Sequence, residues 1–147
     1  MQEHKNTSYY EQRLSDINFL KSKNINPYPH YFNRSNKINE LLIYDNISSG
    51  EHREDIVIST AGKVILKRSS GKNLFFYTLE DESSEIQIIS SLSYFEENKL
   101  TFHEINNIIH RGDIIGIKGF IGKSKRGELS IFVKDIILLT PSLHTLT

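Results

Sequence analysis

Side chains able to bind a nucleic-acid base are concentrated in the segment from Ala61 to Gln87. This segment combines several cations, adjacent aromatic residues, a charged turn and a glutamine within an apolar run. Phe76 offers a ring on which an unpaired base can stack. Gln87 offers an amide that can both donate to and accept from the Watson–Crick edge of a base. The two side chains can act together only if the fold places them on the same surface.

Strand alternation places Phe76 and Gln87 on the outer face of one hairpin, because successive side chains in a strand point to opposite sides. The side chains expected to point inward are apolar: Phe75, Tyr77, Leu79, Ile86 and Ile88. A turn centred between Asp81 and Glu82 would put Phe76 directly opposite Gln87. The next permitted register makes them diagonal neighbours, about 7–8 Å apart. Both registers leave the ring and the amide on the same face.

Two basic segments flank this hairpin in a chain whose formal net charge is zero. Their local fields can still act on a ligand within a Debye length. The candidates for contacts with RNA phosphates or bases are Arg68 and Lys72 in the first segment, and Lys123, Lys125 and Arg126 in the second. Glu128 follows the second segment and could accept a hydrogen bond from a base. Taken singly, each residue is more typical of an ordinary solvated surface.

The first part of the chain has helical periodicity. Ser8 and Glu11 form a capping-box pattern, which predicts a helix to about Lys23, before the prolines at 27 and 29. Its apolar stripe is expected to be Tyr10, Leu14 and Ile17, and residues 1–7 are expected to be loose. A second, shorter helix is predicted over residues 37–44, followed by a connector at 48–50.

The remainder of the chain predicts five strands and one helix. From residue 56 the hydrophobic period is two, and one face of the first strand is expected to comprise Ile56, Ile58, Thr60, Gly62, Val64 and Leu66. Further strands are predicted over 74–79, 85–89, 114–121 and from 128 to 139, with a helix over 94–110. Five strands with a helix between the third and fourth are typical of an OB-fold Greek-key barrel. The fold class is therefore mainly β, with an N-terminal helical extension.

Several other classes of site have no support in the sequence. The chain contains no cysteine, and its six histidines lack the spacing of metal ligands, so we expect no metal site. Nucleotide-binding glycine motifs and nucleophile elbows are also missing, and we expect neither a catalytic residue nor a cofactor in this chain. The sequence shows neither a signal-peptide core nor a membrane-length apolar run, so we expect a cytoplasmic protein.

Specific motifs resemble the amino-terminal anticodon-binding domain of class II lysyl-tRNA synthetases. They are YYEQRLSDINFLKSKNINPYPHYF, AGKVILKRSSGKNLFFYTLED, EIQI, RGDIIGIKGFIGKSKRGELSIF and LLTPSLHTL. The resemblance covers nearly the whole chain from about Ser8. The aspartyl and asparaginyl synthetases share this domain and are alternatives. A freestanding OB-fold module that binds single strands or proteins is a further alternative.

The resemblance implies a binding site for the anticodon loop of a lysine tRNA with a central uridine. By motif position, Phe76 resembles the ring that stacks on an anticodon base, and Gln87 resembles the reader of the central uridine. Arg68 and Glu128 resemble further anticodon contacts. The segment 71–76 departs from the pattern, because it is one residue longer than in some bacterial members.

The resemblance also implies a larger parent enzyme. Such an enzyme is a homodimer that joins lysine to tRNA with ATP and magnesium, in a catalytic domain expected beyond Thr147. Within this chain we expect a helical extension over residues 1–54, the OB-fold domain over 55–140, and the start of a connector over 141–147. The chain alone is expected to bind tRNA without charging it.

Overall fold

The computed structural model describes residues 2–26 and 32–143, and within the first seven residues only the backbone. Eight elements follow one another: α1 (Gln2–Ser22), the 3-10 helix η1 (Ile38–Tyr44), β1 (His52–Ser69), β2 (Leu74–Glu80), β3 (Glu85–Ser91), α2 (Phe102–Ile108), β4 (Ile114–Lys123) and β5 (Leu129–Thr140). The strands close a barrel in the order β1-β2-β3-β5-β4, with β3 parallel to β5 and the other pairs antiparallel. The predicted OB-fold arrangement is confirmed.

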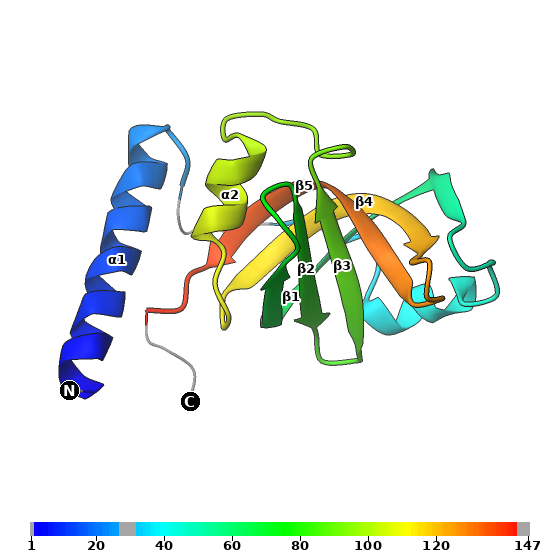
Figure 1. The fold of residues 1–147 in the computed structure, drawn as a ribbon, viewed down its shortest axis with the longest axis horizontal. Helices are drawn as coiled ribbons and strands as arrows, with labels where there is room; N and C mark the ends of the chain where they lie inside the picture. The colour runs from blue at the N-terminus through cyan, green and yellow to red at the C-terminus, as the bar shows by residue number, and fades with distance from the viewer. Residues whose placement is uncertain (1, 27–31, 144–147) are drawn as a thin grey trace.

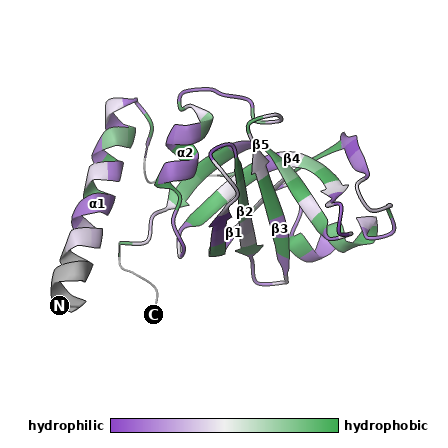
Figure 2. Cartoon of the chain, viewed as in Figure 1, coloured by the Kyte–Doolittle hydropathy of each residue, from purple (hydrophilic) through white to green (hydrophobic). Residues whose placement is uncertain are grey.

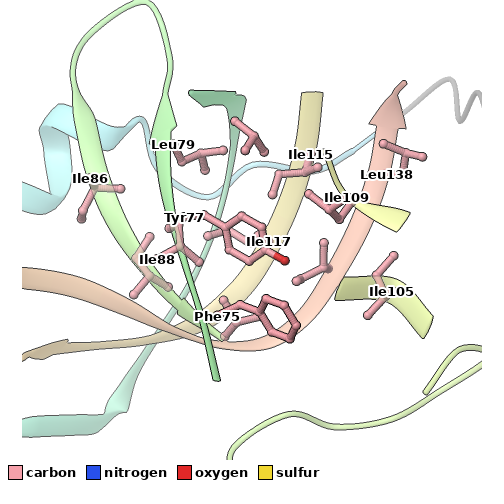
Figure 3. Packing of buried hydrophobic residues seen from close by; sticks show 14 of the residues in the cluster. Phe75, Tyr77, Leu79, Ile86, Ile88, Ile105, Ile109, Ile115, Ile117 and Leu138 are labelled. Carbon is pink, nitrogen blue, oxygen red and sulfur yellow. The ribbon is translucent and has the colours of Figure 1, made fainter. Parts of the chain in front are cut away.

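The barrel interior is filled by the alternate side chains of its strands. Figure 3 shows Phe75 and Tyr77 pointing toward the interior together with residues of β3, β4 and α2. The five side chains expected inside the hairpin are at most 8% exposed. The hydrophobic residues lie mainly along the strands, while hydrophilic residues are frequent on α1 (Figure 2). The predicted inner face of the hairpin is therefore confirmed.

A β-bulge changes the face of β1 part-way along the strand. Val64 pairs with Leu79, but Leu66 pairs with Thr78, so Ile65 is an extra residue on β1. Val64 is fully buried, whereas Leu66 is 59% exposed. The expectation that Leu66 points inward is wrong, because the extra residue reverses the alternation beyond it.

The N-terminal helix packs with a face that shares Ile17, but not Tyr10 and Leu14, with the predicted stripe. Tyr10 and Leu14 are each 39% exposed, while Arg13, Ile17 and Leu20 are at most 6% exposed. The helix stands beside α2 and the end of β5 (Figure 1). The buried face of the helix is the one that contacts the barrel. Arg13 is part of this face, at a position where an apolar residue would be expected.

Arg13 joins α1 to the barrel through a buried ion pair. Its guanidinium donates to Asp113 Oδ2 at 2.8 Å, to the carbonyl of Ile108 at 2.6 Å and to that of Ser142 at 3.2 Å. Both charged side chains are fully buried. The backbone N–H of Ser142 also donates to Asp113 Oδ1 at 2.7 Å. One cluster thus holds α1, the end of α2 and the chain after β5 together.

The first and last residues of α1 are not set by the signals that were expected to set them. α1 begins at Gln2, so Ser8 and Glu11 lie inside it and residues 2–7 are helical where a loose segment was expected; residue 1 lies outside the described residues. It ends before the prolines, which lie outside the described residues: Asn24 has φ 59° and the N–H of Ile25 donates to the carbonyl of Leu20 at 3.0 Å.

The second predicted helix is present as η1, and the third is shorter than predicted. α2 covers seven residues and begins at a capping box, in which Thr101 accepts from the N–H of Glu104 and Glu104 accepts from the N–H of Thr101. The prediction that this helix begins near residue 94 is wrong, because the apolar residues before Thr101 belong to a loop.

Candidate nucleic-acid interface

The β2–β3 hairpin has the second of the two expected registers. Phe76 pairs with Ile89, and Thr78 pairs with Gln87. The ring of Phe76 and the amide of Gln87 are therefore diagonal neighbours on the outer face. Both side chains are half-buried, so each offers part of its surface to a ligand while the barrel restrains the rest.

The bulge in β1 brings Arg68 to this outer face. Arg68 pairs with Phe76 across the β1–β2 ladder. Its guanidinium carbon lies 4.2 Å from the centroid of the Phe76 ring, a cation–π contact. Without the extra residue at position 65, Arg68 would point to the interior. The bulge thus creates the pairing of cation and ring.

The same bulge turns Lys67 inward. Its ammonium donates to the carbonyl of Ile109 at 2.7 Å and to that of Asn106, near the end of α2. Burial lowers the pKa of Lys67 to about 8. The two adjacent cations of β1 therefore have different roles. Lys67 stabilises the fold, and Arg68 faces outward.

Gln87 is oriented by a short chain of hydrogen bonds to β5. Parallel pairing places Gln87 opposite Ser130. Gln87 Nε2 donates to Ser130 Oγ at 3.1 Å, and that hydroxyl donates to the carbonyl of Glu128 at 3.0 Å. Because the hydroxyl proton is used toward Glu128, Ser130 must accept from the amide nitrogen. The amide oxygen of Gln87 then points away from Ser130 and can accept a hydrogen bond.

The turn between β4 and β5 carries the second group of cations. Gly127 has φ 88°, and a side chain there would also meet Ser49 Oγ at 2.8 Å. Lys125 and Arg126 are exposed at the tip, beside the exposed Glu128. The ammonium of Lys123 donates a hydrogen bond to the carbonyl of Asp45 at 2.6 Å. Lys125 and Arg126 are therefore the cations of this turn that are open to a ligand.

These side chains surround one open hollow of about 690 Å³. Of the eight residues singled out in the sequence, seven line it: Arg68, Phe76, Gln87, Lys123, Lys125, Arg126 and Glu128. Lys72 lies outside it, exposed between β1 and β2. The hollow is bordered by four cationic side chains and one carboxylate, which gives it a positive field suited to an anionic ligand.

The floor of the hollow is an aromatic cluster that the sequence analysis missed. The rings of Phe120 and Phe132 are stacked, with centroids 5.2 Å apart and planes 3° apart. Tyr94 meets both rings edge-on, and the centroid of His52 lies 4.3 Å from that of Phe132. These residues come from β1, β4, β5 and the loop after β3. No local sequence spacing joins them, so only the barrel topology could have revealed the cluster.

Other kinds of site were sought in the part of the chain that the structure describes. Over residues 2–26 and 32–143, no group of three or more acidic or histidine side chains is arranged to hold a metal ion. In the same residues, no helix is both long and apolar enough to span a membrane.

Comparison with known proteins agrees with this geometry. The family model of the OB-fold nucleic acid binding domain matches residues 58–139, more than half of the chain. The chain belongs to this family. The match contains Arg68, Phe76, Gln87 and Glu128, which lie on β1, β2, β3 and the turn between β4 and β5.

Curated relatives extend the similarity of this OB-fold domain to α1. A lysine–tRNA ligase of Cladosporium cladosporioides is 40% identical over 146 residues, covering 94% of this chain and 24% of the relative. That of Methanospirillum hungatei is 40% identical, covering 99% of this chain and 28% of the relative. That of Thermosipho melanesiensis is 36% identical, covering 92% and 27%. The chain spans about a quarter of the length of these relatives.

Proposed function

We propose that this chain is the anticodon-binding domain of a lysine–tRNA ligase, and that it binds the anticodon loop in the hollow between the β2–β3 hairpin and the β4–β5 turn. The observation that carries the proposal is the meeting of Arg68, Phe76, Gln87 and Glu128 around one positively charged hollow. The family match and the names of the relatives support it.

The residue types suit a single-stranded loop better than a duplex. A half-buried ring such as Phe76 can stack only on a base whose face is free, as in an RNA loop. The Gln87 amide oxygen, directed away from Ser130, can accept from the imino N–H of a uridine. Cytidine has no proton at that ring position, so this contact distinguishes a central uridine from a central cytidine. Phe76 therefore contributes affinity by stacking, and Gln87 contributes specificity for uridine.

The charged residues divide between base and phosphate contacts. Lys125 and Arg126, exposed at the turn, contact phosphates, and Lys72 and Lys123 contribute to the field around the loop. Glu128 accepts from a base beside the uridine. Arg68 leaves its position over the Phe76 ring, or stacks on the incoming base, as guanidinium planes do on RNA bases.

In the proposed whole enzyme, this domain selects the tRNA while another part joins lysine to it. ATP, magnesium and lysine are assigned to regions of the relatives that this chain does not span. A homodimer and a cytoplasmic location are further proposals carried by the resemblance. This chain contributes affinity and specificity for tRNA.

Titration with two RNAs tests the proposal. One is a stem–loop carrying the anticodon loop of a lysine tRNA, and the other is the same stem continued as a blunt duplex. The logarithm of the binding constant of the stem–loop should fall linearly with the logarithm of the salt concentration, and the duplex should bind much more weakly. Equal binding of both RNAs, or no binding of the stem–loop at low salt, would overturn the proposal and favour a protein-binding module.

A further inference from the structure

The wall of the hollow opposite the β2–β3 hairpin contains an exposed histidine on an aromatic base. The His52 ring centroid lies 4.3 Å from that of Phe132 and 5.8 Å from that of Phe120. Tyr94 stands nearly perpendicular to it, at 81° and 5.7 Å, with its hydroxyl 3.4 Å from His52 Nδ1. Phe120 and Phe132 are buried, Tyr94 is half-buried and His52 is exposed. The histidine is therefore held by fixed rings while part of its own surface faces the solvent.

A close approach beneath His52 makes this arrangement possible. His52 begins β1 and pairs with Gly122 of β4. A side chain at position 122 would lie 2.6 Å from the ring of Phe132. Glycine at this position lets the Phe132 ring lie under the histidine. The histidine is thus supported from below, as a stacking platform must be.

The position of this second platform is set by the barrel. Phe76 pairs with Ile89, and Ile89 pairs with Phe132. Phe132, on which His52 rests, is therefore two strand spacings from Phe76, about 10 Å. Backbone positions two strand spacings apart can present their side chains to two splayed nucleotides of one loop. Both platforms line the same hollow, whose volume is about 690 Å³.

We infer that His52 and Tyr94 form a second base-stacking position, which takes a loop nucleotide other than the one on Phe76. The inference rests on the proposed function, since it assigns a second nucleotide of the same single-stranded loop. Lys125 and Arg126 of the β4–β5 turn line the hollow with His52 and hold the intervening phosphates. The OB-fold thereby binds two bases of the RNA loop at two separate aromatic stacking positions. Gln87 acts at the first of them.

Pairing protein variants with abasic RNAs tests this assignment. The protein variants are His52→Ala, His52→Phe, His52→Lys, Tyr94→Leu and Phe76→Ala. The RNAs are the anticodon stem–loop and versions of it in which one loop base at a time is removed. His52→Ala should weaken binding of the intact loop between about fivefold and about 150-fold, the range for one lost stack. His52→Phe should retain most of the affinity, because it keeps a ring.

The decisive measurement is the affinity of each variant for each abasic RNA. It shows which missing base abolishes the effect of each substitution on binding. His52→Ala and Tyr94→Leu should have no further effect when one particular base is absent, and Phe76→Ala should be silent at a different base. Tyr10→Leu is the matched control, because Tyr10 is a ring on α1 outside the hollow, and it should leave binding unchanged. Urea unfolding of each variant checks that the barrel is intact.

The alternatives give distinct results. If Phe76→Ala weakens binding but His52→Ala and Tyr94→Leu do not, the second stacking position is refuted and the proposed function stands. If His52→Lys binds as well as wild type whereas His52→Phe does not, the residue acts by charge and the inference is wrong. If the wild-type chain does not bind the loop, both the inference and the proposed function fail.

Discussion

Replacing Phe76 by alanine removes the ring on which the proposed function depends most. Loss of one base–aromatic stack costs about 1–3 kcal/mol, or about fivefold to 150-fold in Kd. In the unbound chain the Arg68 guanidinium already covers this ring at 4.2 Å. Displacing the guanidinium from this contact, which lies at the surface, costs about 0.5–1 kcal/mol. We therefore expect the lower part of the range for Phe76→Ala, about 1–2 kcal/mol.

The assay is fluorescence anisotropy of a labelled anticodon stem–loop at one fixed salt concentration. Phe76 also packs against the cluster of Ile89, Phe120 and Phe132, so Phe76→Leu is the matched control for packing. It keeps an apolar side chain and lacks a π face, and it should lose most of the same affinity. Wild-type affinity in a folded Phe76→Ala variant would refute the stacking role. Wild-type affinity in Phe76→Leu alone would show an apolar contact without stacking.

Three further predictions concern the charged groups. Lys125→Ala should weaken binding of all loop sequences alike and reduce the salt-dependence slope by about 0.7 to 1; an unchanged slope would exclude a phosphate contact. Arg13→Met should lower the free energy of unfolding by about 3–5 kcal/mol in urea, because Asp113 would stay buried without its cation; the exposed Lys21→Met on the same helix should not, and equal effects would contradict this role. Burial alone would raise the pKa of Asp81, but hydrogen bonds from Ile38, Ser83 and Ser84 outweigh it and bring the pKa to about 2. The stability that this carboxylate contributes is complete above its unfolded pKa of about 4 and is lost as the pH falls toward 2. Asp81→Asn should therefore flatten the unfolding free energy over that interval, and an unaltered profile would show that other carboxylates cause the loss.

The succession of strands along the chain and the inner face of the hairpin could be predicted because they depend on local alternation. Phe75 and Tyr77 had to point inward, and the acidic turn limited the register to two choices. The choice between them needed the structure, since a turn of two residues and a turn of four were equally compatible with the sequence. The pairing of Thr78 with Gln87 decided it.

The features that could not be predicted depend on contacts between distant segments. The bulge at Ile65 cannot be located from the hydrophobic pattern, because Val64, Ile65 and Leu66 are all apolar. It nevertheless decides that Arg68 and not Lys67 faces the ligand. Arg13 reads as a solvated residue of α1 until Asp113, 100 positions away, is placed beside it. The aromatic floor under His52 likewise joins four segments. Hydrophobic periodicity describes one helix or strand at a time, so it does not show which residues of distant segments are in contact.

The central claim is that this hollow reads a uridine, and one comparison tests it most directly. Two stem–loops that differ only in the central base, uridine or cytidine, are titrated into the wild-type chain and into Gln87→Ala. Leaving the hydrogen bond to Gln87 unmade should cost the cytidine loop about 1–3 kcal/mol in the wild type. The Gln87→Ala variant should bind the two loops alike. Equal binding of the two loops by the wild-type chain would contradict the account.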